Sequence, residues 1–454
     1  MNCSNHSSTA RFAHYVHFAC IILAMARCAT AAPPNFVLIV ADDLGYGDLG
    51  CYGNMRNRTP HLDRLAQSGL RFTDFHSNGA MCSPTRAALM TGRYQQRVGI
   101  ERPLDEDEQG LPTETVTIAE RLRDAGYATA IFGKWHLGTI ANGPTLHGFD
   151  QYIGHTTGDS DYFSRISRAG QPDWWRQTTP LSVKGYNTDL LTEHAIEFIE
   201  SHRDRPFFLY LPHTAIHFPW QAPSDTDPAT HRQVGLGASS PGLTKLGHHR
   251  NTTRAVRSMI ESLDQNVGRL IETLQRLQLR ENTLVLFTSD NGGYISYHGL
   301  HHGQISANDP LRGEKADLYE GGHRVPAIAS WPGMIGARRV TQETATSMDV
   351  MPTLLSLANA DTQSDSQTMD GIDLRDLLLK DQPLPERVLF WRDEDAQAAR
   401  LGSWKLVQTA DAKRLYNLDH DLGEQHDCSA VYPEIVKRLD SELNKWNAEV
   451  GGQR

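Results

Sequence analysis

Cys82 is the residue whose surroundings in the sequence point most clearly to chemistry. It is followed by Ser83, Pro84, Thr85 and Arg86. Pro84 suits the first turn of a helix and Ser83 can cap it, so we expect Cys82 at a helix N-terminus. Backbone N–H groups and the helix dipole favour an anion there, and Arg86 can bring its guanidinium to the same place. The segment predicts an activated cysteine beside an anion pocket, although a buried structural thiol is the plain alternative.

Two apolar stretches, at residues 35–41 and 283–288, end in side chains that carry oxygen. These side chains are Asp42, Asp43, Asp290 and Asn291. The stretches have the composition of buried strands, and ligand sites of open α/β sheets lie beyond the carboxyl ends of the strands. One acidic strand end could be only a turn, but several that converge form an all-oxygen set suited to a hard cation. The pattern therefore predicts a metal site.

Two further apolar stretches, at residues 128–132 and 206–211, lead to basic side chains: Lys134 and His136 after the first, His213 and His217 after the second. Lys134 and His136 are two residues apart, so in an extended segment both would point to one side. A histidine near a reacting group can act as a general acid, whereas a histidine in a loop is more often only polar surface.

The elements that must position these residues alternate along the chain. Apolar strands are separated by amphipathic patterns, including one that follows Thr188-Asp189 and a long one at residues 253–278. This alternation predicts an α/β fold, with a large, mostly parallel β-sheet sandwiched by helices. A polar segment then precedes short strands near 387–392, 404–408 and 414–418 and a helix at about 432–447. We assign residues 32–380 to a catalytic domain and 381–454 to a smaller C-terminal α+β subdomain.

Residues 1–31 have the pattern of a secretory signal peptide. The apolar run at residues 18–26 is too short to span a bilayer, and the small residues Ala29-Thr30-Ala31 suit cleavage. An apolar N-terminal helix of a cytosolic protein is the alternative. No later run of 18 apolar residues follows, so we expect a secreted or periplasmic protein with no membrane attachment after cleavage.

Composition narrows the classes of partner. The 454-residue chain has a formal net charge of -10, which argues against nucleic acid as a partner but allows a locally positive pocket for a small anion. Three of the six cysteines lie in the predicted signal, which leaves Cys51, Cys82 and Cys428. Either Cys51 pairs with Cys428 in a disulfide, or both are buried thiols.

The segment 82–93, which contains C-x-P-x-R and then T-G-R, resembles the hallmark of the type I, formylglycine-dependent sulfatases of the alkaline phosphatase superfamily. Residues 126–136 are similar to the second signature of that family, and the similarity continues through 206–219, 289–292 and 320–326. Within that family the chain resembles arylsulfatases and N-acetylgalactosamine-6-sulfatases. Thr85 departs from the usual Ser or Ala, and Phe132 replaces a smaller residue.

The resemblance implies a role for each matching residue. Cys82 would be oxidised by a formylglycine-generating maturation enzyme, and the hydrate of the resulting Cα-formylglycine would be the nucleophile. The ligands of one divalent cation, usually Ca²⁺, would be Asp42, Asp43, Asp290, Asn291 and the formylglycine at position 82. Arg86 would hold the formylglycine oxygens, Lys134 would bridge nucleophile and metal, and His136 would help the sulfated hydrate to collapse. His217 would be the general acid, with His213 as its rival, and Lys315 would bind the sulfate.

The resemblance predicts a sulfuric ester hydrolase, and a sulfated carbohydrate is the preferred substrate ahead of a small aryl sulfate. A phosphate or phosphonate ester hydrolase and an inactive secreted glycan-binding protein are the alternatives. Candidate substrate contacts are aromatic segments, for which ordinary loop packing is an equally good interpretation: Asp161-Tyr162-Phe163 and Trp174-Trp175. The pairs His248-His249 and His301-His302 are candidates for the pocket rim.

Overall fold

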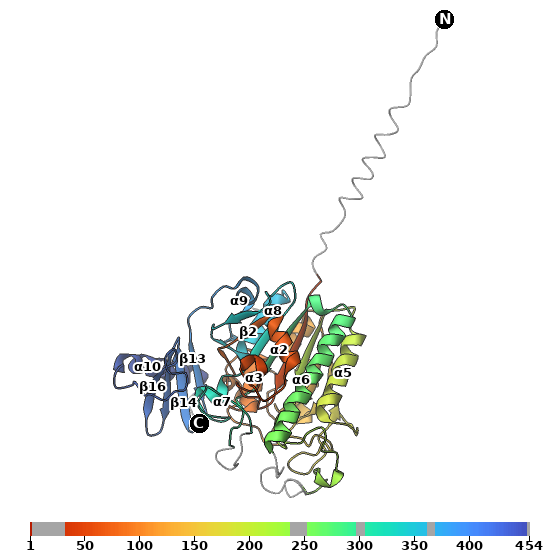
Figure 1. Ribbon diagram of the computed structural model, residues 1–454, viewed down its shortest axis with the longest axis horizontal. Coiled ribbons are helices and arrows are strands. Elements are labelled where there is room, and N and C mark those ends of the chain that lie inside the picture. Colours follow the sequence, from red (N-terminus) through yellow and green to blue (C-terminus); the bar gives the residue numbers. More distant parts are fainter. Residues whose placement is uncertain (2–31, 237–251, 297–304, 361–367, 452–454) are drawn as a thin grey trace. The chain divides into compact units, whose positions relative to one another are not determined.

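The computed structural model describes residue 1 and residues 32–236, 252–296, 305–360 and 368–451 (Figure 1). Residues 2–31 of the predicted signal peptide lie outside the described residues, and so do His248-His249 and His301-His302. Residues 34–454 form one structural unit, which holds every element described below.

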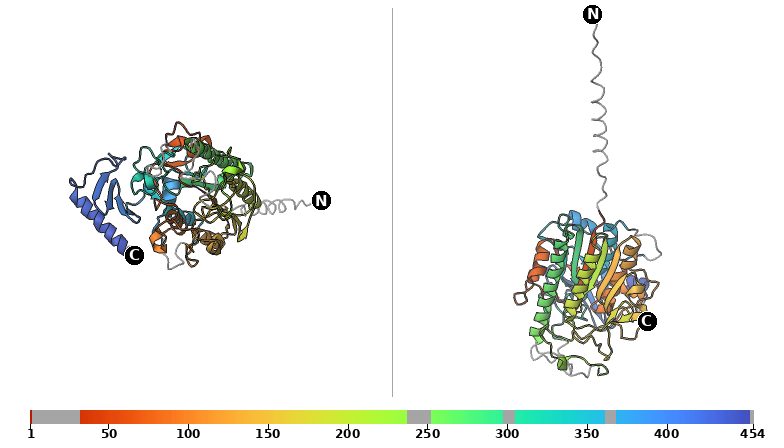
Figure 2. Two further views of the ribbon diagram at one scale, coloured as in Figure 1. Left: turned by 90° about the horizontal axis from the view of Figure 1, so that it is seen from below. Right: turned by 90° about the vertical axis from the view of Figure 1, so that its right-hand side faces the viewer.

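Ten strands form the large sheet, in the order β11-β2-β10-β9-β1-β8-β4-β5-β6-β7. Their bounds are β1 Asn35–Ala41, β2 Leu70–Phe72, β4 Ala128–Lys134, β5 Gln151–His155, β6 Trp175–Arg176, β7 Thr179–Pro180, β8 Phe207–Pro212, β9 Thr283–Ser289, β10 Ala327–Ser330 and β11 Arg339–Thr341. The five central strands β9, β1, β8, β4 and β5 are all parallel, and β10 and β6 run antiparallel to their neighbours. The right-hand view of Figure 2 shows these strands side by side. The predicted mostly parallel sheet is confirmed.

Helices cover both faces of this sheet, which is why every residue of β1 is buried. Val37 and Ile39 face one apolar cluster, whereas Phe36, Leu38 and Val40 face the other. The first cluster takes in α2 (Pro60–Gln67), α5 (Asn187–Ser201) and α6 (Thr252–Arg276), and α5 and α6 run side by side in Figure 1. The second takes in α3 (Cys82–Thr91), α4 (Ile118–Asp124), α8 (Val350–Leu357) and α9 (Arg375–Lys380). The long helix predicted at 253–278 ends two residues early.

Shorter elements connect these layers. A two-stranded sheet pairs β3 (Phe75–His76) with β12 (Ala345–Thr346), and α7 is a single turn at Glu320–His323. Turns of 3-10 helix lie at Gly50–Tyr52, Gln95–Val98, Ile140–Asn142, Pro144–Leu146, Pro228–Thr230, Arg280–Asn282 and Ser347–Asp349.

A separate antiparallel sheet follows near the C-terminus, in the order β13-β14-β15-β16. Its strands are Val388–Arg392, Ala396–Leu401, Trp404–Thr409 and Lys413–Asn417, and α10 (Pro433–Val450) contacts it. The three predicted strands and the predicted helix are confirmed, whereas β14 was not predicted. The domain boundary at residues 380 and 381 stays a prediction.

Two observations bear on the remaining expectations. Within the described ranges, Cys51, Cys82 and Cys428 are all free thiols, so the alternative of a Cys51–Cys428 disulfide is not formed. Cys51 and Cys428 are half-buried rather than fully buried. Of the helices that the structure describes, none combines the length and the apolar character needed to cross a bilayer.

Candidate active site

The adjacent strands β1 and β9 bring four oxygen-bearing side chains together. The strands are parallel and Ala41 pairs with Ser289, so Asp42 and Asp43 emerge beside Asp290 and Asn291. The backbone N–H of Asp43 donates to Asp290 Oδ1 at 3.3 Å, and Asn291 Nδ2 donates to Asp43 Oδ1 at 2.8 Å. All four residues are buried. The structure thus gathers the predicted ligands at one edge of the sheet.

Three cationic side chains neutralise the three carboxylates. Lys134 Nζ lies 2.6 Å from Asp42 Oδ2, and Lys315 Nζ lies 2.5 Å from Asp43 Oδ1. Arg86 donates to Asp290 Oδ2 from Nη2 at 2.7 Å and from Nε at 3.1 Å. Three formal negative charges therefore face three positive ones, so an added divalent cation would leave the centre positive and suited to a sulfate group.

The carboxylates titrate differently because their surroundings differ. Burial alone would raise the pKa of Asp42, but the charges of Lys134, His217, Arg86 and Lys315 outweigh it and lower that pKa. Burial, together with the nearby charge of Asp42, raises the pKa of Asp290 to about 6, against the opposing effect of Arg86.

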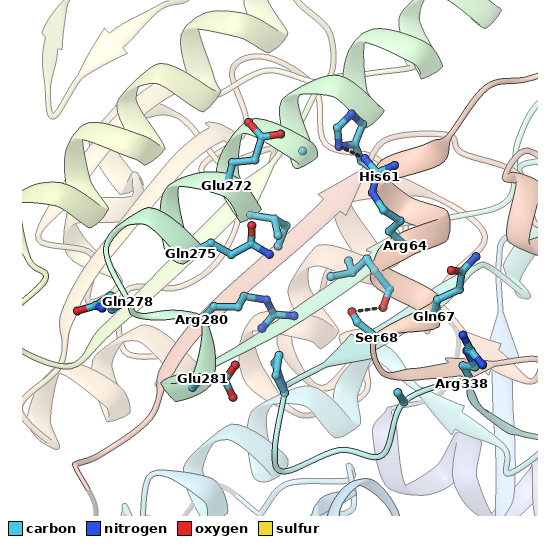
Figure 3. Close-up of a pocket in the computed structure, with 15 residues that line it drawn as sticks. His61, Arg64, Gln67, Ser68, Glu272, Gln275, Gln278, Arg280, Glu281 and Arg338 are labelled. Atoms are coloured by element: carbon cyan, nitrogen blue, oxygen red, sulfur yellow. Dashed lines mark hydrogen bonds between the residues drawn. The ribbon is translucent and has the colours of Figure 1, made fainter.

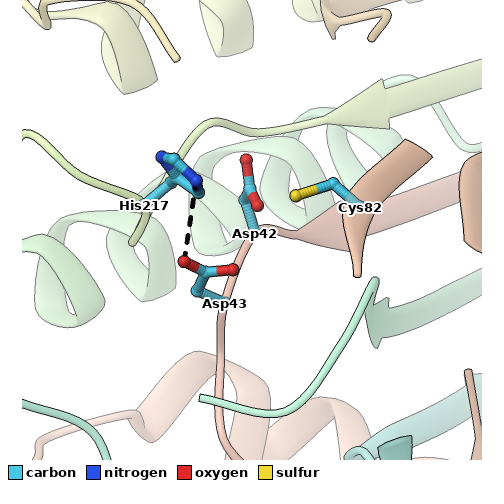
Figure 4. Close-up of side chains that lie close together, drawn as sticks. All are labelled: Asp42, Asp43, Cys82 and His217. Carbon is cyan, nitrogen blue, oxygen red and sulfur yellow. Dashed lines mark ion pairs between the residues drawn. The ribbon is translucent and has the colours of Figure 1, made fainter. Parts of the chain in front are cut away.

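The donor set fits a hard divalent cation. Among the described residues, Asp42 Oδ1 and Asn291 Oδ1 are buried oxygens without a hydrogen-bond partner, and such atoms are costly unless something satisfies them. Asp42, Asp43, Cys82 and His217 each offer an atom within 4.8 Å of the others, and Figure 4 shows these side chains together. Carboxylate and amide oxygens are the ligands that Ca²⁺ takes, and it tolerates irregular geometry.

Cys82 is the first residue of α3, so the predicted place at a helix N-terminus is what the structure shows. The predicted cap is wrong: Met81 precedes the helix, and Ser83 Oγ instead accepts a hydrogen bond from the Leu104 N–H at 3.1 Å. Cys82 Sγ lies 3.3 Å from Lys315 Nζ. Burial raises the pKa of the thiol, against the opposing charges of Lys134 and Lys315, so the thiol stays neutral near pH 7.

Arg86 contacts the carboxylates rather than the sulfur. Beyond its two bonds to Asp290, its Nη1 donates to the Lys134 carbonyl at 3.0 Å. Arg86 therefore fixes the end of β4 and the carboxylate of Asp290, and its role toward the formylglycine oxygens stays a prediction.

The Lys134–His136 segment is not fully extended, contrary to the expectation, because His136 has a left-handed φ of 49°. Both side chains still reach the site. His136 Nε2 lies 3.1 Å from the Leu104 carbonyl, and the buried Nδ1 is without a hydrogen-bond partner among the described residues. Gly158 packs against this imidazole so closely that a Cβ there would lie 2.8 Å from the ring.

The two candidate acids differ in position. His217 lines the site cavity, and its Nε2 lies 3.8 Å from Asp43 Oδ2. Its Nδ1 donates to the Phe218 carbonyl at 2.7 Å, which leaves Nε2 facing the site. His213 is fully buried and is not among the cavity residues, and burial lowers its pKa to about 3.

A cavity of about 330 Å³ opens onto these residues. Four of the predicted site residues line this cavity: Cys82, His136, His217 and Lys315. Sequence reasoning missed the other lining residues, which include Leu104, Asp105, Glu106, Asp159, Arg168 and Tyr294. They lie on loops, where neither periodicity nor a motif distinguishes them from ordinary surface residues.

The larger cavity of this chain, about 1090 Å³, lies elsewhere, between α2 and the end of α6 (Figure 3). Its polar side chains include His61, Arg64 and Glu272, and it contains none of the predicted site residues. Size alone therefore does not identify the active site in this molecule.

The predicted aromatic contacts belong to loop packing. Tyr162 is fully buried and donates to the carbonyls of Thr214 and His217, at 2.7 and 3.0 Å, so it supports the loop that carries His217. Trp174 is buried, and Trp175 donates to Asp173. None of these aromatic residues lines the site cavity.

Comparison with known proteins agrees with this geometry. The sequence profile described as Sulfatase matches residues 34–360, which is most of the chain. The chain belongs to the sulfatase family. Arylsulfatase A of Bos taurus is 38% identical over 398 residues, covering 81% of this chain and 72% of that protein. N-acetylgalactosamine-6-sulfatase of Canis lupus familiaris is 34% identical over 396 residues, covering 82% of this chain and 71% of that protein.

The fold is similar to that of a solved structure, Ps i-CgsB in complex with k-i-k-neocarrahexaose. It has a TM-score of 0.80 and 30% sequence identity, and covers 91% of this chain and 92% of that one. The sulfatase assignment and the α/β architecture of the alkaline phosphatase superfamily, both expected from the sequence, are confirmed. The protein is a sulfatase and hydrolyses sulfate esters.

Proposed function

We propose that this sulfatase removes sulfate from a carbohydrate, with a Cα-formylglycine hydrate derived from Cys82 as nucleophile and Ca²⁺ as cofactor. The observation that carries the proposal is the position of Cys82, at a helix N-terminus in the cavity, 3.3 Å from Lys315 Nζ and beside the carboxylate cluster. The proposal of a carbohydrate substrate is supported by the neocarrahexaose bound to Ps i-CgsB and by the name of the related N-acetylgalactosamine-6-sulfatase.

The metal would be held by Asp42, Asp43, Asp290 and Asn291, with the oxidised residue 82. When bound, a divalent cation lowers the pKa of a nearby hydroxyl group and neutralises sulfate oxygens. Lys134 holds Asp42 in place and Arg86 holds Asp290, so the ligand carboxylates are fixed before substrate arrives. Lys315 lies between Asp43 and residue 82, where its ammonium group would bind a sulfate oxygen.

The first step is a transfer of the sulfuryl group. One hydroxyl group of the hydrate gives its proton to a carboxylate of the neighbouring cluster as its oxygen attacks the sulfur, and the bond between sulfur and the sugar oxygen breaks. His217, protonated at Nε2, gives its proton to the leaving alkoxide, which departs as the alcohol. General acid catalysis of this kind contributes about 100-fold to 10,000-fold in rate.

The second step returns the enzyme to its starting state. His136 accepts the proton of the remaining hydroxyl group, the bond between carbon and the sulfated oxygen breaks, and sulfate leaves as the aldehyde forms again. Addition of water to the aldehyde restores the hydrate, and proton exchange with the solvent returns the carboxylate cluster, His136 and His217 to their starting protonation states. The buried His136 Nδ1, which has no partner among the described residues, supports this assignment.

We further propose that the protein is secreted or periplasmic, with residues 1–31 as its signal peptide, and that a formylglycine-generating enzyme matures Cys82. The pattern at residues 18–31 supports the first proposal and the C-x-P-x-R segment supports the second. Mass spectrometry of the mature N-terminus tests the cleavage site.

Sulfate release from matched sulfated mono- and oligosaccharides, with an aryl sulfate and an aryl phosphate beside them, tests the proposed function. We expect turnover of carbohydrate sulfates, weaker turnover of the aryl phosphate, and none of either by Cys82→Ala. A clear preference for the phosphate ester would support the alternative hydrolase. Binding of sulfated glycan without release of sulfate would support the glycan-binding alternative.

The metal is tested by chelation. Removal of the cation should abolish turnover and lower the melting temperature, because Asp42 Oδ1 and Asn291 Oδ1 would again lie buried and unsatisfied. Addition of Ca²⁺ should restore both. Full activity in chelator, with no metal found by elemental analysis, would contradict the assignment.

A further inference from the structure

Building on the proposed function, we propose that Arg168 binds a second anionic group of the substrate, so that the preferred substrate is a carbohydrate with another sulfate or a carboxylate near the sulfate that is removed. Three observations support the proposal: the position of Arg168, the contacts that orient its side chain, and the volume of the cavity.

Arg168 lies on the side of the cavity where the alcohol must leave. His217 marks that side, since it donates the proton, and the next residue, Phe218, also lines the cavity. The guanidinium of Arg168 lies 6.0 Å from the centre of the Phe218 ring. A sugar whose sulfate reaches Cys82 would therefore extend along Phe218 toward Arg168.

A buried carboxylate orients the Arg168 side chain. Asp159 Oδ2 accepts from Arg168 Nε at 2.9 Å and from Nη2 at 2.5 Å. The other oxygen of Asp159 contacts Nη1 of the buried Arg232 at 2.5 Å. Two guanidinium groups thus share one carboxylate, and they lower the pKa of Asp159 to about 2 although burial acts to raise it. An arginine fixed in this way loses little freedom when it binds an anion.

The residues on both sides of Arg168 are also anchored. Glu106 accepts from Ser167 Oγ at 2.7 Å and from the Ala169 N–H at 3.0 Å. Glu106 therefore supports the segment that carries Arg168. Asp105 is the third acidic residue that lines the cavity, and its Oδ2 lies 3.8 Å from Arg102 Nη1. Two of the three carboxylates at the cavity mouth thus hold Arg168 in place.

The cavity volume limits what fits inside. At about 330 Å³ it is near the small end of the usual range for ligand pockets, which begins at about 300 Å³. A sulfate and the sugar that carries it fill such a space, so any further group extends past the rim. The Arg168 side chain is 57% exposed at that rim, where such a group would reach it.

The experiment compares two oligosaccharides with the same scissile sulfate, one of which carries a second sulfate on the adjoining sugar. Wild type should prefer the doubly sulfated one. Arg168→Ala should reduce that preference, measured as the ratio of the two kcat/KM values, by about 10-fold to 100-fold, because a charge-assisted hydrogen bond is lost. The lost preference should appear mainly as a higher KM for the doubly sulfated oligosaccharide. Arg203→Ala is the matched control, since Arg203 is 61% exposed, precedes the start of β8 whereas His217 follows its end, and does not line the cavity.

The outcomes separate this inference from the proposed function. An unchanged ratio in Arg168→Ala would overturn the inference, and so would an equal fall for both substrates with kcat reduced, which indicates a structural role. Partial restoration of the ratio by Arg168→Lys would support it. Failure of wild type to release sulfate from any carbohydrate, with aryl sulfate still hydrolysed, would instead overturn the proposed carbohydrate substrate.

Discussion

The proposed role of His217 as general acid can be tested, because the leaving groups of different substrates differ in how much they need a proton. A sugar alkoxide is a poor leaving group, whereas an activated phenolate departs almost unaided. His217→Ala should therefore lower kcat/KM for carbohydrate sulfates by about 100-fold to 10,000-fold, and much less for nitrophenyl sulfate. Steady-state kinetics with both substrates measures the difference. Equal losses would show that His217 binds rather than protonates.

His213 should affect stability instead of turnover. Burial lowers its pKa from 6.5 to about 3, and neither ring nitrogen has a hydrogen-bond partner among the described residues. The unfolded chain therefore binds one more proton than the folded chain between these pH values, so stability falls as pH falls from 6.5 toward 3. The slope from this residue is about 1.4 kcal/mol per pH unit.

The variant His213→Phe replaces the imidazole with an aromatic ring that does not titrate, so it should flatten that part of the pH dependence. Urea unfolding of both proteins at several pH values between 4 and 7 gives the comparison. Turnover at pH 7 should remain, because His213 does not line the cavity. A loss of activity like that of His217→Ala would make His213 the acid.

The secondary elements of the site could be predicted because each has a strong local pattern. The residues of β1 and β9 are mostly apolar, and six of the fourteen are β-branched, so the acidic residues that follow them are conspicuous. β14 could not be predicted in this way, because its sequence AQAARL is rich in residues that strands rarely use. It is a strand because β13 and β15 pair with it on both sides, which is a tertiary effect.

The loop residues that line the cavity could not be predicted for a related reason. Glu106 contacts the segment of Arg168 from 61 residues away, and Asp159 meets Arg168 through the fold of an irregular loop nine residues long. Ser83 shows the opposite error, since a residue type that often caps helices lies inside α3 and binds the Leu104 N–H. Local preference is informative only where tertiary contacts agree with it.

The C-terminal sheet contributes to the site through α7. Lys405 of β15 lies 3.0 Å from both Glu320 Oε1 and Glu424 Oε1, and all three side chains are fully buried. Glu320 begins α7, and the carbonyl of Gly322 in that helix accepts from the Gly292 N–H at 2.9 Å. Gly292 directly follows Asn291. The loop that carries the predicted ligands is therefore fixed in part from the C-terminal sheet.

Lys405→Met should lower the free energy of unfolding by about 3 to 5 kcal/mol, because two buried carboxylates lose the cation between them. The control is Lys413→Met in the neighbouring strand β16, whose partner Asp440 is partly exposed and whose loss should cost at most about 1 kcal/mol. Denaturant unfolding measures both. Equal, small effects would show that the network does not stabilise α7.

At the scale of the whole molecule, the site exists only in the folded chain. Its charged residues range from Asp42 to Lys315 in sequence, and the parallel strands bring them to one edge. The chain as a whole carries a formal charge of -10, yet three cationic side chains gather at this edge. These cations balance the three carboxylates of the site, so a divalent cation bound there would give an acidic protein a locally positive centre for an anion.

The most direct test of the account is mass spectrometry of the peptide that contains residue 82, taken from enzyme of measured activity. A thiolate that attacked sulfate would leave a sulfated cysteine with no easy route to release, whereas a sulfated hydrate expels sulfate as the aldehyde forms again. We predict the aldehyde mass, lighter than unmodified cysteine, in proportion to specific activity. Full activity in protein that contains only the unmodified Cys82 thiol would contradict the formylglycine mechanism.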